Sequence, residues 1–117
     1  MSASENGIEQ LDPDAADAVL AQGGFLLDVR EDDEWAAGHA PAATHLPMGQ
    51  VPDGHVGLLP RDQRIVVMCR SGARSNRVAG FLREAGYDAV NAAGGMQAWA
   101  ASGRAVVDGE GGSGTVA

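Results

Sequence analysis

The 117-residue sequence has one cysteine, Cys69, and no lysine, so all eight of its basic residues are arginines. A single cysteine excludes an internal disulfide, a paired-cysteine redox motif and a zinc site built on several thiolates. Aromatic residues make up only 4% of the chain, so the core must consist of smaller side chains. We expect neither a metal nor a cofactor.

Long apolar segments are also missing. No run approaches the roughly 18 apolar residues that a membrane span requires. The first ten residues, MSASENGIEQ, lack the basic and apolar regions of a secretion signal. We therefore expect a cytoplasmic protein with no membrane partner.

The charge is negative overall and unevenly distributed. The net charge of −8 argues against a nucleic-acid partner. Residues 1–60 carry eleven acidic residues against Arg30 alone, whereas residues 61–117 carry seven arginines and five acidic residues. The arginines near Cys69 therefore predict a local positive patch that suits a small anion.

Short apolar runs alternate with helical patterns along the chain, and those at residues 25–29 and 64–69 are typical of strands covered on both faces. Strands are predicted at residues 25–29, 43–47, 64–69 and 87–91. Helices are predicted at residues 11–24, 30–38, 75–86 and 94–103. This order favours a single α/β domain with an open sheet and right-handed crossovers.

Three segments complete the prediction. Residues 48–63 contain two prolines and three glycines and are expected to be mostly irregular. In the helix at 75–86, Val78, Phe81 and Leu82 are expected to face the core. Residues 1–107 are expected to form the domain, and the glycine-rich residues 108–117 a disordered tail.

Cys69 lies where an apolar strand meets the turn RSGARS. Sites in open α/β sheets lie beyond the carboxyl ends of the strands, so we expect the thiol at the bottom of a crevice. Inward amide hydrogens and the N-terminus of the next helix would favour a thiolate, with a pKa lowered from about 8.5 to between about 3.5 and 7.5. The alternative is an inert core cysteine, which would need no arginine-flanked turn.

Three segments together resemble the rhodanese-like domain family, with a likeness that runs from about Leu11 to Val107. They are LLDVREDDEWAAGHAPAATHLP, then the loop CRSGARS, and finally GGMQAW. The resemblance implies an open, mostly parallel sheet of about five strands with helices on both faces. It also implies a sulfurtransferase in which Cys69 accepts a sulfane sulfur from thiosulfate or a related donor. The Cys69 persulfide would then pass that sulfur to cyanide, to a thiol or to a protein acceptor.

The site residues follow from the loop and from the resemblance. Cys69 is the predicted nucleophile, and the predicted substrate and persulfide binders are Arg70, Ser71, Gly72, Ala73, Arg74 and Ser75. Asp28 and Arg30 either border the site or form a structural salt bridge, in which Arg30 pairs with Asp28 or Glu34. His39 is interpreted as a residue that fixes its loop through a hydrogen bond rather than as a catalytic base.

Two other functions remain open. Tyrosine phosphatases use a loop of cysteine, five residues and arginine, whereas four residues separate Cys69 from Arg74, which disfavours a phosphatase or an arsenate reductase of longer loop. A persulfide-carrying or sensing module that relays sulfur between proteins fits the single cysteine as well as an enzyme does.

Overall fold

A six-stranded sheet forms the centre of the computed structural model, which describes residues 2–3 and 7–117. The strands are β1 (Ser2–Ala3), β2 (Glu9–Leu11), β3 (Phe25–Asp28), β4 (Thr44–His45), β5 (Ile65–Met68) and β6 (Ala89–Ala92). The helices are α1 (Pro13–Ala21), α2 (Asp32–Ala37), the 3₁₀ turn η1 (Met48–Gln50), α3 (Val51–Leu58), α4 (Ala73–Glu84) and α5 (Gly95–Ala101). The strand order is β1-β2-β6-β5-β3-β4, and only the β1–β2 pair is antiparallel.

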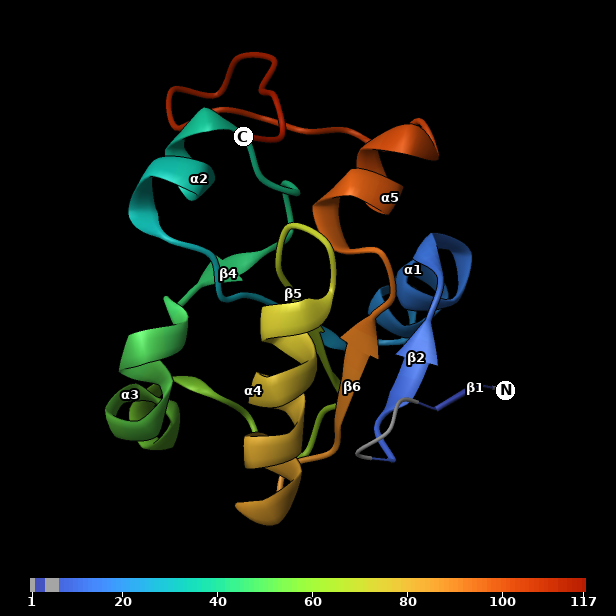
Figure 1. The fold of residues 1–117 in the computed structure, drawn as a ribbon, viewed down its shortest axis with the longest axis vertical. Helices are drawn as coiled ribbons and strands as arrows, with labels where there is room; N and C mark the ends of the chain where they lie inside the picture. The colour runs from blue at the N-terminus through green and yellow to red at the C-terminus, as the bar shows by residue number, and fades with distance from the viewer. Residues whose placement is uncertain (1, 4–6) are drawn as a thin grey trace.

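Helices cover both faces of this sheet (Figure 1). Successive strand residues point to opposite faces, so Leu27 and Val67 pack on one side and Leu26 and Val66 on the other. The first side is covered by α3 and α4, and the second by α1 and α5. The predicted α/β fold, with a mostly parallel sheet and helices on both faces, is confirmed.

The segment at residues 48–63 is not mostly irregular, as the sequence predicts, because η1 and α3 occupy residues 48–58. Pro52 lies in the first turn of α3, where a missing amide hydrogen costs no helical hydrogen bond. Val51 is 1% exposed and packs in the core, and such tertiary packing stabilises a short helix despite two glycines.

The predicted core face of α4 is partly wrong. Val78 and Leu82 are buried, but Phe81 is 38% exposed. Its ring meets the imidazole of His55 from α3 edge-on, with centroids 5.5 Å apart. Phe81 therefore lies at the rim between the two helices rather than in the core.

The C-terminal residues return along α2 (Figure 1). Val107 forms an antiparallel bridge with His39, and the amide of Thr115 donates to the carbonyl of Ala37 over 2.9 Å. Disorder of residues 108–117 in solution stays a prediction, and in the structure this segment lies against α2.

A buried ion pair follows β3. The guanidinium of Arg30 donates to both carboxylate oxygens of Asp28, at 2.8–3.1 Å, and its Nη2 also donates to the carbonyl of Gly38 at 2.7 Å. Both side chains are fully buried. Of the two pairings that the sequence leaves open for Arg30, the structure forms the one with Asp28, which ties the end of β3 to the end of α2.

The substitution Asp28→Asn is expected to lower the free energy of unfolding by about 3–5 kcal/mol, because it leaves the Arg30 charge buried without its partner. Urea denaturation measures the loss. The matched control is Asp88→Asn, whose carboxylate is 49% exposed and pairs with Arg64, and whose loss should stay under about 1 kcal/mol. Equal losses in the two variants would contradict the assigned role.

Candidate active site

Cys69 follows β5, a central strand of the sheet, at its carboxyl end. Residues 69–72 turn directly into α4, and Gly72 makes this possible with a left-handed φ of 105°. A side chain at Gly72 would also press on the amide nitrogen of Gly94, 3.3 Å from an added Cβ. The sulfur of Cys69 is therefore held beneath the first turn of a twelve-residue helix, fully buried.

Several hydrogen-bond donors surround this sulfur. The amide of Gly72 lies 3.1 Å from Sγ, and the hydroxyl of Ser75 lies 3.2 Å from it. Burial acts to raise the pKa of the Cys69 thiol. The Ser75 hydroxyl, when its hydrogen points to Sγ, and the backbone amides of Ser75, Gly72 and Ser71 lower the pKa, and the net pKa is below that of an ordinary thiol. The loop thus favours a negatively charged sulfur.

The outer side of the loop rests on α5. The amide of Met96 donates to the carbonyl of Cys69 at 2.8 Å, and the amide of Gln97 donates to the carbonyl of Arg70 at 3.0 Å. These amides belong to the first turn of α5 and have no partner within their own helix. A Cβ at Gly95 would overlap the carbonyl of Cys69 and lie 2.7 Å from that of Arg70, so only glycine permits this approach.

Arg74 points across to α2. Its two terminal nitrogens donate to the two carboxylate oxygens of Glu34, at 2.7 and 2.9 Å. The hydrogen bond from Arg74 lowers the pKa of Glu34 to about 2. Glu34 also accepts a hydrogen bond from the amide of Glu31, the N-cap residue of α2, so Glu34 both caps this helix and holds Arg74.

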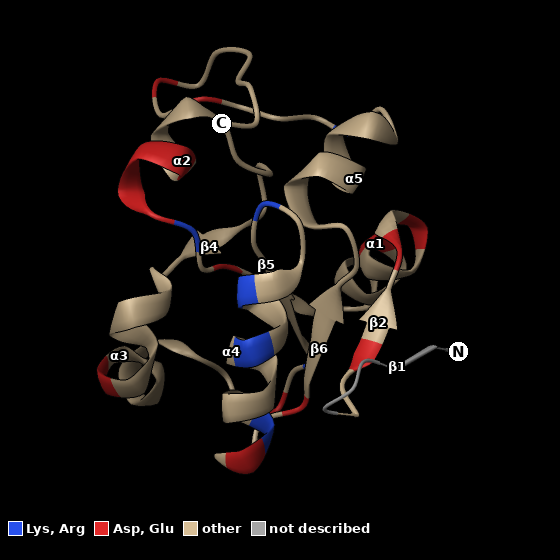
Figure 2. Cartoon of the chain, viewed as in Figure 1, with Lys and Arg blue, Asp and Glu red and all other residues tan. Residues whose placement is uncertain are grey.

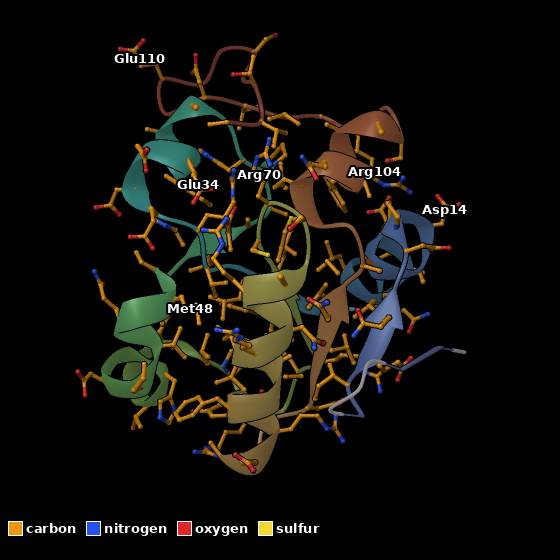
Figure 3. All side chains as sticks on the ribbon, viewed as in Figure 1. Asp14, Glu34, Met48, Arg70, Arg104 and Glu110 are labelled. Carbon is orange, nitrogen blue, oxygen red and sulfur yellow. The ribbon has the colours of Figure 1, made fainter. Side chains whose placement is uncertain are left out.

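Arg70 is the exposed cation of the loop. Its Nε donates to the carbonyl of Ala117 at 2.8 Å. Figure 2 shows the loop and α4 carrying basic residues, whereas α1 and α2 carry acidic ones. In Figure 3, Arg70 lies at the mouth of the loop, between α2, which bears Glu34, and α5.

The predicted supporting residues Asp28, Arg30 and His39 form hydrogen bonds with groups other than the Cys69 sulfur. Asp28 and Arg30 bond to each other, and the carbonyl of Arg30 lies 2.7 Å from Nε2 of His45. Nδ1 of His39 lies 2.8 Å from the carbonyl of Trp35, and its ring stacks on the indole with centroids 3.6 Å apart. This is the geometry of a residue that fixes its loop.

Three residues of the site escape the sequence analysis. From the sequence alone, Glu34 is identified only as a possible partner of Arg30, Gly95 only within the segment GGMQAW, and Asn91 only as the end of a predicted strand. Asn91 lies 2% exposed beside Ser75, with its Oδ1 at 2.6 Å from the hydroxyl. The local sequence carries no signal for Glu34 or Asn91, because their partners lie 40 and 16 positions away.

In the part of the chain that the structure describes, no three histidine, cysteine, aspartate or glutamate side chains gather where they could ligate a metal ion. None of the described helices has the length and apolar character needed to cross a bilayer.

Known proteins resemble this chain in sequence and in fold. The model of the rhodanese-like domain family matches residues 12–102. YtwF of Bacillus subtilis, whose name proposes a sulfurtransferase activity, is 47% identical over 75 residues, which are 64% of this chain and 72% of YtwF. A sulfurtransferase of Allochromatium vinosum is 41% identical over 88 residues, 74% of this chain and 81% of that protein.

A solved structure agrees. The crystal structure of a rhodanese-related protein from Thermoplasma volcanium superposes with a TM-score of 0.77 at 27% identity. The match covers 85% of this chain and 97% of that one.

The rate of Cys69 alkylation should rise with pH, and the midpoint of this rise should lie below the pKa of about 8.5 that is typical of a free thiol, because the loop amides stabilise the thiolate. The rate of reaction with iodoacetamide, measured against pH, gives the midpoint. The same chain unfolded in urea supplies the reference, since it contains no other thiol. A folded midpoint at or above the unfolded one would rule out activation by the loop.

The substitution Gly95→Ala should displace the loop and destabilise the fold by about 2–5 kcal/mol, from backbone strain and overpacking against the carbonyls of Cys69 and Arg70. It should also slow alkylation of Cys69. The control is Gly103→Ala, because Gly103 has a φ of 85° but no described atom within 4 Å of an added Cβ. This control should lose only about 1–2 kcal/mol and keep the reactivity of Cys69.

Proposed function

The chain belongs to the rhodanese-like domain family, and we propose that it is a sulfurtransferase whose Cys69 takes a sulfane sulfur from thiosulfate or a related donor and passes it to cyanide or a thiol. The observation that carries this proposal is the convergence of loop amides on the Cys69 sulfur. Such a ring of donors stabilises an anion at a fixed point, as an oxyanion hole does.

In the first step the Cys69 thiolate attacks the outer sulfur of thiosulfate. A bond forms between Sγ and that sulfur, the sulfur–sulfur bond of thiosulfate breaks, and its electron pair leaves with sulfite. The charge of the persulfide then lies on the transferred sulfur, where amides of residues 70–75 would hold it.

In the second step the acceptor attacks the transferred sulfur. The bond between that sulfur and Sγ breaks, and its electron pair returns to Cys69 as a thiolate. With cyanide as acceptor the product is thiocyanate, and with a thiol, which attacks as its thiolate, the product is a new persulfide. Neither step requires a proton once the thiolate exists, so no general base is assigned to His39.

The arginines have unequal roles in this proposal. Arg74 is already paired with Glu34 through two hydrogen bonds, so it fixes the loop against α2. Arg70 is exposed at the mouth of the loop and is the cation that would attract a dianionic donor.

The size of the loop favours sulfur over phosphoryl transfer. Four residues separate Cys69 from Arg74, and the guanidinium of Arg74 turns to Glu34 rather than over the sulfur. Because Cys69 is fully buried, a donor must present a narrow reactive group. A terminal sulfur atom is narrower than a tetrahedral phosphoryl group.

Incubation with thiosulfate should add the mass of one sulfur atom to the protein, and cyanide should remove it and release thiocyanate. Intact-mass spectrometry detects the adduct, which should persist because the chain has no second cysteine to resolve it. The variant Cys69→Ser should show neither adduct nor turnover.

A cysteine desulfurase used as the sulfur donor distinguishes an enzyme that uses thiosulfate from a carrier that receives sulfur from another protein. Loading from the desulfurase but not from thiosulfate would indicate a carrier that relays sulfur between proteins. An unmodified Cys69 with both donors would overturn the proposal.

A further inference from the structure

A chain of buried polar side chains leads away from Cys69 through Ser75. The Ser75 hydroxyl oxygen lies 3.2 Å from Cys69 Sγ and 2.6 Å from Asn91 Oδ1. Ser75 is fully buried, and Asn91 is 2% exposed on β6. A serine hydroxyl has one hydrogen, so it donates to only one of these two atoms at a time.

The backbone carbonyl of Gly72 fixes the orientation of the Asn91 side-chain amide. Its Nδ2 donates to the carbonyl of Gly72 at 3.1 Å and to Oε1 of Gln10 at 2.8 Å. A carbonyl oxygen only accepts, so the amide nitrogen must face Gly72 and Oδ1 must face Ser75.

Gln10 repeats this constraint on the outer side. Its Nε2 donates to the carbonyl of Ile8 at 3.0 Å and to Oδ1 of Asn76 at 2.8 Å. Its Oε1 is therefore left to accept from Asn91. Hydrogen-bond donation therefore runs away from Cys69: Asn91 donates to Gln10 and to the Gly72 carbonyl, and Gln10 donates to the Ile8 carbonyl. The Oδ1 atom of Asn91 is left as an acceptor that needs a donor.

The donor available to Asn91 Oδ1 is the Ser75 hydroxyl, at the shorter of its two distances. The serine then offers Cys69 a lone pair, which suits an S–H group and opposes a negatively charged Sγ. We propose that Asn91 is a positioning residue that turns the Ser75 hydroxyl hydrogen away from Cys69 and favours states in which Sγ carries no negative charge.

The consequence for sulfur transfer rests on the proposed function. Sγ is uncharged in the thiol and also in the persulfide, whose charge lies on the outer sulfur. It is charged only in the thiolate. Asn91 therefore disfavours the free thiolate relative to the persulfide, which promotes loading of Cys69 with sulfur.

Charged groups near the loop do not account for this effect. They are Arg70 in the loop, Arg74 on α4 with its partner Glu34 on α2, and the Asp28–Arg30 pair after β3. All of them stay in place when Asn91 is replaced, so a change in the titration of Cys69 would not come from them.

Infrared spectroscopy tests the proposal on the unmodified protein. Cys69 is the only source of an S–H stretching band, and at a pH where the thiol is protonated this band should lie below that of a free thiol, because the S–H donates to Ser75. In Ser75→Ala the band should move up toward the free position. A parent band already at that position would overturn the proposal.

The variant Asn91→Val frees the Ser75 hydroxyl to donate to Sγ. The midpoint of Cys69 alkylation should fall by about one pH unit, a roughly tenfold gain in thiolate on the acidic side. In the Ser75→Ala background the same substitution should leave the midpoint unchanged. The control Val90→Ala alters a buried β6 residue that packs on the other face of the sheet, and it should not move the midpoint.

A midpoint unchanged by Asn91→Val, or shifted equally with and without the Ser75 hydroxyl, would overturn the proposal. These measurements use no sulfur donor. They therefore remain decisive for Asn91 even where the proposed sulfur transfer fails.

Discussion

The hydrogen bonds from α5 to the carbonyls of Cys69 and Arg70 are the interactions on which the site depends. A peptide group is planar and trans, so its N–H and C=O point in opposite directions. When the carbonyl of Arg70 is held outward by Gln97, the amide of Ser71, in the same peptide plane, must point inward. The Ser71 amide, one of the donors that lower the pKa of Cys69, is thus oriented by α5. This explains why a glycine-rich turn directly precedes that helix.

Cys69 belongs to the hydrophobic core as much as to the site. It packs in the same buried cluster as Val67 and Val78, and burial alone would raise the pKa of its thiol. Amides overcome that cost without bringing a second charge into the core. The two arginines of the loop stay outside the core, with Arg74 joined to Glu34 across two helices and Arg70 exposed to solvent.

The sequence predicted most of the fold because its strongest patterns are local. The apolar runs at β3 and β5 and the Asp12–Pro13 start of α1 need no partner to be recognised. Helix α3 escaped because its stability comes from the burial of Val51, against the propensities of Pro52 and two glycines. At the site, the loop could be read from residues 69–75, but the roles of Glu34, Asn91 and Gly95 depend on contacts between distant segments. Periodicity and spacing do not record such contacts.

Because the single thiol is completely buried, its reaction with a thiol reagent reports local opening of the structure. A bulky thiol reagent reaches Cys69 only when the loop lifts from α5 or the domain unfolds, so its rate reports how often that happens, as amide exchange does for a backbone hydrogen. The dependence of that rate on urea would separate the two routes, because lifting the loop exposes little surface and global unfolding exposes much. The modification rate of Cys69 would thus show whether the loop opens by itself or only together with the rest of the fold.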